Sequence, residues 1–166
     1  MATSKPRTAT PSATRAASAA IESALRTLDA EASGITALVN ALQSDLGAAF
    51  DAAIARVRDA KGRLIVTGLG KSGHIGKKMA ATFASTGTPS FFVHAAEASH
   101  GDLGMITPDD VIMALSWSGE TAELKNLINY SRRFRIGLIA VTSEADSTLG
   151  AAAEDAQLNA RPPTSC

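Results

Sequence analysis

Four short apolar runs, separated by segments of helical character, dominate the chain between residues 63 and 142. They read RLIVTG (63–68), SFFVH (90–94), DVIMALS (110–116) and IGLIAVT (136–142). The runs are apolar throughout, as strands are when helices cover both faces of a parallel sheet. We therefore expect an α/β fold, a three-layer doubly wound parallel sheet of five strands, the weak fifth lying near 156–159.

The segments between the apolar runs carry apolar residues at helical spacing. Helices are expected over 74–86 and 121–133, with a short one around 147–153. The side chains expected to face the sheet are Ile75, Met79, Phe83, Leu124, Leu127 and Ile128.

Two further helices are predicted before the sheet. Apolar residues recur at spacings of three and four from Ile21 to Leu42, which predicts an amphipathic helix about 35 Å long. Its apolar stripe packs on its own domain or on a second subunit, and its length beside a small core favours assembly. The second helix is expected to start with Asp45 as its N-cap and to end at Lys61-Gly62.

These patterns divide the chain into four parts: a leader (1–17), N-terminal helices (18–60), a sheet domain (61–159) and an irregular tail (160–166). The leader is rich in Ala, Ser and Thr, so we expect it to be disordered. Because it has basic residues and no acid, it also loosely matches an organelle transit peptide.

Length and charge restrict the function. A chain of 166 residues with 45% hydrophobic side chains can bury one sizeable core. Sixteen basic residues balance sixteen acidic ones, so no overall field favours nucleic acid or an anionic membrane. The apolar runs are too short to cross a bilayer as helices, and Cys166, the only cysteine, allows no internal disulfide. We expect a soluble single-domain protein in which any specificity for anions is local.

A glycine-rich turn, VTGLGKSGHIG (66–76), follows the first apolar run. It fits G-x-G-x-x-G, but the second predicted strand ends in His94 where a dinucleotide site needs an acid. A triphosphate loop needs glycine where Ile65 stands. The backbone N–H groups, with Lys71 and Ser72, instead suit a single phosphate or a carboxylate. A tight turn without a ligand is the alternative interpretation.

The segment SWSGET (116–121) is a second candidate anion site, at the end of the third run. Its three hydroxyl groups cluster around Gly119 before a predicted helix, whose free N–H groups and dipole favour phosphate. Capping alone would need only one hydroxyl. Glu120 and Glu123 would complement the helix dipole, and Glu123 also lies near where a substrate bound to the loop would extend.

The three histidines, His74, His94 and His100, all fall near the predicted ligand-binding edge of the sheet. Their spacing matches no structural zinc pattern. One of them is better interpreted as a general acid or base, because histidine titrates near neutral pH. A hydrogen-bonded structural role is the alternative for each.

The run GLGKSGHIGKKMAATFASTGTPSFFVHAAEASHGDLGMI, followed by ALSWSGETAEL, closely resembles the arabinose-5-phosphate isomerases of the sugar isomerase (SIS) domain superfamily. The resemblance implies a phosphosugar-binding SIS fold. It also implies an enzyme that interconverts D-ribulose 5-phosphate and D-arabinose 5-phosphate through an enediol, for Kdo and lipopolysaccharide biosynthesis. Such enzymes are cytoplasmic homotetramers that require no cofactor, which gives the long N-terminal helix a role in assembly.

The resemblance also assigns roles to individual positions. Lys71 and Glu123 match the family's catalytic lysine and glutamate, and His100 matches a substrate contact placed to move protons. His94 matches a residue linked to an inhibitory zinc ion. The positions that match substrate contacts and the phosphate cradle are Gly70, Ser72, Gly73, Gly87, Thr88, Ser116, Ser118, Gly119 and Thr121.

Two departures from the family pattern bear on activity. Trp117 stands where many relatives have asparagine. The chain ends in LNARPPTSC, where the family continues with a second catalytic glutamate, a distal histidine and two cystathionine-β-synthase-type domains. We therefore expect a truncated chain in which the fold and phosphosugar affinity survive better than turnover. The alternative to an active isomerase is an impaired phosphosugar-binding fragment or a sensor domain, although no helix-turn-helix precedes the sheet.

Overall fold

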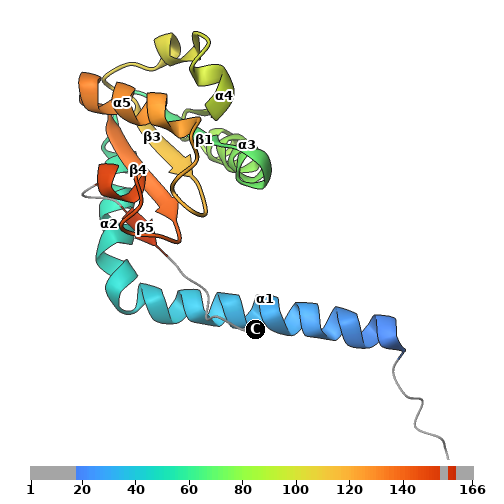
Figure 1. Ribbon diagram of the computed structural model, residues 1–166. Helices are drawn as coiled ribbons and strands as arrows, with labels where there is room; N and C mark the ends of the chain where they lie inside the picture. The colour runs from blue at the N-terminus through green and yellow to red at the C-terminus, as the bar shows by residue number, and fades with distance from the viewer. Residues whose placement is uncertain (1–17, 154–156, 160–166) are drawn as a thin grey trace, which may run out of the picture.

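The computed structural model describes residues 18–153 and 157–159. Its strands form one parallel sheet in the order β2-β1-β3-β4-β5 (Figure 1). They are β1 (Leu64–Gly68), β2 (Ser90–His94), β3 (Val111–Leu115), β4 (Gly137–Thr142) and β5 (Gln157–Asn159). The predicted doubly wound, five-stranded parallel sheet is confirmed. The expected leader and tail lie outside the described residues.

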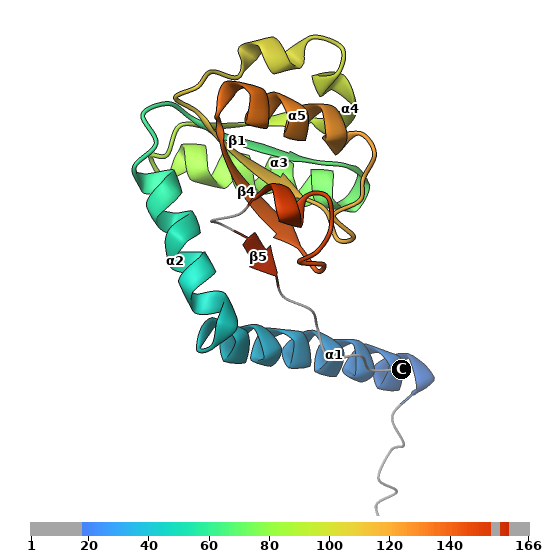
Figure 2. The same ribbon diagram turned by 60° about the vertical axis from the view of Figure 1, so that its left-hand side comes forward.

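Helices lie on both sides of the sheet, which gives the three layers. The helices of the described residues are α1 (Ala19–Leu42), α2 (Asp45–Arg58), α3 (Gly70–Ser85), α4 (Ala95–Ala98) and α5 (Leu124–Phe134), with 3-10 helices η1 (Asp102–Met105) and η2 (Gly150–Ala152). The helices α4 and α5 cover one face, and α2 and α3 cover the other (Figures 1 and 2).

Neighbouring strand residues point into different layers, so the strands are buried on both sides. Ile65 and Ile112 pack in the core that contains Leu127 of α5. Val66 packs in the other core, with Ala80 of α3. The side chains of these four larger residues, Ile65, Ile112, Leu127 and Val66, are 0% exposed. Full burial of each such side chain stabilises the fold by about 1.5–3 kcal/mol, which explains why the strand sequences are apolar throughout.

The predicted inward face of α3 is partly wrong. Met79 and Phe83 pack against the core as expected, but Ile75 is 59% exposed. The helix approaches the sheet through small residues instead. At Gly76, for example, a Cβ atom would lie 3.0 Å from the ring of Phe92. This close approach turns Ile75 away from the sheet.

The inward face of α5 is confirmed, because Leu124, Leu127 and Ile128 are 0–3% exposed. The helix begins at Leu124, three residues later than predicted. The residues before it form a turn in which Leu124 N–H donates to the carbonyl of Thr121 at 3.1 Å. The short helix expected around 147–153 is present as η2.

The N-terminal helices form nearly as predicted, with corrections at the ends of α2. Its N-cap is Ser44, not Asp45, and the Ser44 hydroxyl donates back to Asn40 of α1 at 3.0 Å. The helix ends at Arg58, before the predicted Lys61-Gly62. Gly62 instead allows a close approach to the residues just before β3, where a Cβ atom would lie 2.5 Å from the Asp110 carboxylate. No residue of α1, which is described throughout, is buried, and the helix projects away from the sheet (Figures 1 and 2).

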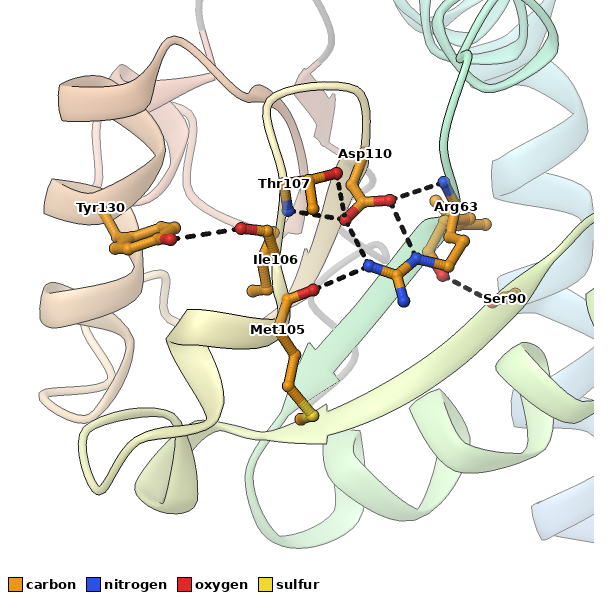
Figure 3. A network of polar contacts seen from close by, with 8 residues as sticks. Arg63, Ser90, Met105, Ile106, Thr107, Asp110 and Tyr130 are labelled. Atoms are coloured by element: carbon orange, nitrogen blue, oxygen red, sulfur yellow. Dashed lines mark hydrogen bonds and ion pairs between the residues drawn. The ribbon is translucent and has the colours of Figure 1, made fainter.

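A network around Asp110 joins the amino ends of β1 and β3 (Figure 3). Asp110 is 2% exposed, and its carboxylate accepts hydrogen bonds from Arg63 N–H (2.7 Å), Nε (3.1 Å) and Nη2 (2.9 Å). It also accepts from the N–H (2.8 Å) and hydroxyl (3.1 Å) of Thr107. Burial raises the pKa of Asp110, but the bonds from Arg63 and Thr107 outweigh burial and lower it to about 2. The same Arg63 donates to the carbonyl of Met105 at 2.7 Å, which ties η1 to the network.

Candidate functional site

A pocket of about 500 Å³ lies at the carboxyl edge of the sheet. Lys71 and Ser72 from α3 line it together with Ser116, which follows β3, and Thr142 at the end of β4. The carboxyl ends of parallel strands meet at one edge, so the two loops singled out by sequence contribute to one pocket. The opposite wall is apolar and comes from α1 and α2, and the 64% exposed Trp117 lies at the pocket.

The first loop is a sharp turn from β1 into α3. Gly70 has a φ of +55°, a conformation that favours glycine, and it opens the helix. The N-cap residue of α3 is Leu69, whose apolar side chain cannot accept a hydrogen bond from the first N–H groups of the helix, and no cap hydrogen bond is formed within the described residues. Those N–H groups, the half-buried Ser72 and the exposed Lys71 therefore combine positive potential with hydrogen-bond donors. The arrangement suits an anion.

The second loop concentrates hydroxyl groups in front of α5. The Oγ of Ser116 and the Oγ1 of Thr121 are 2.7 Å apart and share a hydrogen bond. Ser116 Oγ also accepts from Gly119 N–H at 3.1 Å, and Ser118 Oγ accepts from Glu120 N–H at 3.3 Å. The predicted cluster of three hydroxyls around one glycine is therefore present in the structure.

The two glutamates of this loop have different surroundings. Glu123 is the exposed N-cap residue of α5, and in the described part of the chain its side chain forms no cap hydrogen bond. Glu120 lies before the helix rather than in its first turn, which corrects the expectation that it complements the helix dipole. Its carboxylate instead accepts from the N–H and hydroxyl of Thr148, and these two bonds lower its pKa. This partner lies 28 residues further along the chain, so the residues next to Glu120 do not indicate it.

Of the predicted site residues, Lys71, Ser72 and Ser116 are the three that line this pocket in the described part of the chain. Glu123 and the other predicted members of the two loops do not line it, and His100, Gly87 and Thr88 lie outside both loops. His100 is exposed between α4 and η1, next to Ser99, which accepts a hydrogen bond from Asn126 of α5 at 2.8 Å. His100 therefore lies in a segment packed on the α5 side of the sheet. Gly87, with a φ of +98°, and Thr88 form the turn before β2, at the amino edge.

His94 lies at the carboxyl end of β2, paired with Gly68 of β1, and its Nδ1 atom is buried without a hydrogen-bond partner in the described residues. Zinc needs three or four protein ligands. Within residues 18–153 and 157–159, no group of three or more His, Cys, Asp or Glu side chains could hold a metal ion. The described residues of one chain thus do not complete a zinc site around His94, and zinc inhibition stays a prediction.

A doubly wound parallel sheet with two hydroxyl-bearing loops at its carboxyl edge defines a class of α/β domains that bind small anionic ligands at that edge. The sequence matches the SIS domain family over residues 57–166, and the chain belongs to this family. None of the described helices is both long and apolar enough to cross a membrane.

The chain is similar to two curated isomerases. Arabinose 5-phosphate isomerase KdsD of Pseudomonas aeruginosa is 52% identical over 134 residues, which are 81% of this chain and 40% of that protein. The protein of the same name from Escherichia coli K12 is 58% identical over 94 residues, which are 57% of this chain and 29% of that protein. The chain thus spans less than half the length of these relatives.

A solved structure shares the fold. A protein of E. coli CFT073 in complex with arabinose 5-phosphate superposes with a TM-score of 0.74 and 36% sequence identity. The match covers 86% of this chain and 76% of that one.

Proposed function

We propose that this protein is a sugar-phosphate isomerase that interconverts D-ribulose 5-phosphate and D-arabinose 5-phosphate in the cytoplasm, as a step toward Kdo and lipopolysaccharide. The observation that carries the proposal is the shared pocket lined by Lys71, Ser72 and Ser116 from the two loops. The names of the KdsD relatives and the arabinose 5-phosphate complex of the E. coli CFT073 protein support the same substrate class.

The phosphate of the substrate would bind where the two loops face each other. The first loop offers the N–H groups at the start of α3 and the hydroxyl of Ser72, with no atom of the described residues within 4 Å of the place where a Cβ atom of Gly70 would lie, whereas Gly73 allows α3 to pack closely on Gly68 of β1. The second offers the hydroxyls of Ser116, Ser118 and Thr121. Because the chain has no net charge, this local set of donors must supply the attraction.

The reaction moves a proton between two neighbouring carbons. A base removes a carbon-bound proton, an enediolate forms, and the proton returns to the adjacent carbon. Lys71, a cation at the pocket, would stabilise the enediolate. Glu123 or His100, neither of which lines the pocket in the described residues, would have to reach the substrate to move the protons. The substrate is neither oxidised nor reduced overall, so the proposed route requires no cofactor.

The decisive experiment supplies ribulose 5-phosphate to the purified chain and follows aldose formation by NMR. Lys71→Ala should lower kcat by about 100-fold or more, because it removes the charge that stabilises the enediolate. Lys78→Ala, an exposed lysine on the same helix, is the matched control and should retain activity. Binding of the pentose phosphate without conversion would contradict the enzyme proposal and favour a phosphosugar-binding or sensor domain.

The proposal includes a homo-oligomer, with a tetramer expected, built on α1. Leu25, Leu28, Ile35 and Val39 of this helix are 48–67% exposed in one chain. A row of aliphatic side chains this long is unusual on a monomer surface. Leu28→Glu should shift the mass measured by light scattering toward the monomer, whereas Glu31→Gln on the same helix should not. A monomeric unaltered chain at micromolar concentration would contradict this part of the proposal.

A further inference from the structure

Glu120 is a carboxylate between residues expected to bind phosphate, where its charge would oppose a second anion. The structure shows where that charge is directed. Glu120 Oε1 accepts from the N–H of Thr148 at 2.6 Å, and Oε2 accepts from its hydroxyl at 2.7 Å. Both carboxylate oxygens are thus bound to one residue of the segment between β4 and η2.

Two further residues of the 116–121 loop, Gly119 and Trp117, are also hydrogen-bonded to the segment that follows β4. The carbonyl of Gly119 accepts from Leu149 N–H at 3.1 Å. The carbonyl of Trp117 accepts from the N–H (2.9 Å) and the hydroxyl (2.8 Å) of Ser143. Residues 117, 119 and 120 are therefore all hydrogen-bonded to the segment 143–149, and this set of bonds, which includes those from Thr148 to Glu120, is called the seam below.

Glu120 is also connected to the hydroxyl cluster. Its N–H donates to Ser118 Oγ at 3.3 Å, and the preceding N–H, of Gly119, donates to Ser116 Oγ at 3.1 Å. Ser116 in turn shares its hydrogen bond with Thr121. Any rotation of the backbone at Glu120 would therefore move the hydroxyls of this loop.

We propose that Glu120 is a positioning residue of the phosphate site. Its carboxylate, held by Thr148, fixes the conformation of the 116–121 loop and keeps its own negative charge hydrogen-bonded to Thr148. The inference rests on the proposed function, because it assumes that this loop receives the phosphate of the substrate.

The test uses the full chain with Glu120→Ala, Glu120→Gln, Thr148→Val, Thr148→Ser and the double variant Glu120→Ala/Thr148→Val. The Kd of inorganic phosphate, KM and kcat for ribulose 5-phosphate, and the unfolding midpoint are measured for each. Glu120→Ala should raise Kd and KM about tenfold while kcat changes less than about threefold, since hydrogen bonds to a charged group are strong.

The other variants act as matched controls. Glu120→Gln keeps the shape and one acceptor, so it should lie between the unaltered chain and Glu120→Ala. Thr148→Val, which lacks the hydroxyl donor, should raise Kd about threefold, whereas Thr148→Ser should match the unaltered chain. The double variant should bind phosphate no worse than Glu120→Ala, because both changes remove the same interaction.

The outcomes separate this inference from the proposed function. If the unaltered chain binds phosphate and Glu120→Ala binds it equally well, with or without a lower unfolding midpoint, the positioning role is overturned and the isomerase proposal stands. If Glu120→Ala does not fold, equal Kd values for Thr148→Val and Thr148→Ser overturn it. If the unaltered chain binds neither phosphate nor ribulose 5-phosphate, the proposed function fails and the positioning role fails with it.

Discussion

The two edges of the sheet use polar groups in opposite ways. At the amino edge, Asp110 is buried with five hydrogen bonds to its carboxylate, all from Arg63 and Thr107 (Figure 3). At the carboxyl edge, Thr67 Oγ1 and His94 Nδ1 are buried without a partner in the described residues. The Asp110 carboxylate is saturated, whereas these two atoms at the carboxyl edge leave bonding capacity unused, although hydrogen bonds also hold the 116–121 loop at that edge. If the carboxyl edge receives the ligand as proposed above, the network around Asp110 is separate from the binding groups.

The largest expected effect comes from removing the charge at the saturated edge. Asp110→Ala should lower the free energy of unfolding by about 3–5 kcal/mol, because it leaves the donors of Arg63 and Thr107 without their acceptor. Chemical denaturation measures the loss. Asp109→Ala, an exposed neighbour, should change stability by less than about 0.5 kcal/mol. Weaker phosphate binding by folded Asp110→Ala would break the proposed separation of the two edges.

A smaller effect is expected from a glycine at the carboxyl edge. Gly119 has a φ of +65°, and a Cβ atom there would overlap the side chain of Ser147. Gly119→Ala should therefore lower the free energy of unfolding by about 2–4 kcal/mol, through backbone strain and overpacking together. Gly70→Ala is the matched control, since its φ is also positive but no atom lies within 4 Å of the added Cβ, and about 1–2 kcal/mol is expected. Equal losses in the two variants would show that Ser147 does not confine the loop.

The smallest predicted effect is a pH dependence at the amino edge. The pKa of Asp110 is about 2 in the folded protein, below the ordinary value of 3.8. The ionised carboxylate therefore stabilises the fold above pH 4, and this contribution, about 2 kcal/mol, is lost as the pH falls through 2. Urea unfolding between pH 4 and pH 2 should show the loss in the unaltered chain. Asp110→Asn should not show this loss of stability between pH 4 and pH 2. An identical pH dependence in both proteins would contradict the assignment of the loss to the Asp110 carboxylate.

Much of the fold was predictable because strands that are buried on both faces are apolar at every position, and such runs can be recognised in the sequence. The bounds of β2 matched the apolar run at 90–94, and β1, β3 and β4 each lost one or two end residues of theirs. The errors occurred where tertiary contacts decided a local choice. Ile75 was expected to face inward from its spacing, but the small residues of α3 pack closer to the sheet than a larger residue could.

The two loops of the candidate site were predictable because the glycine and hydroxyl residues of each are close together in sequence. The seam that holds the second loop was not, since Glu120 and Thr148 are far apart along the chain. The hydroxyl-rich segment VTSEADSTLG, which starts in the last two residues of β4, was the available signal, and the hydroxyls of Thr142 and Ser143 donate to the carbonyl of Trp117. The roles of Lys71, Glu123, His94 and His100 stay predictions, as do the substrate contacts.

Because no residue of α1 is buried, the stability of this helix in a single chain differs from that of the sheet domain. It contains 24 residues, none of them buried, and Gly34 near its middle lowers helix propensity by about 1 kcal/mol relative to alanine. In a lone chain, its order depends on local terms such as the bond from Ile21 N–H to the Ser18 hydroxyl at 3.3 Å. Amide exchange along α1 should therefore slow as protein concentration rises, while exchange in the sheet stays constant. The helical content of this protein is then partly a function of its abundance.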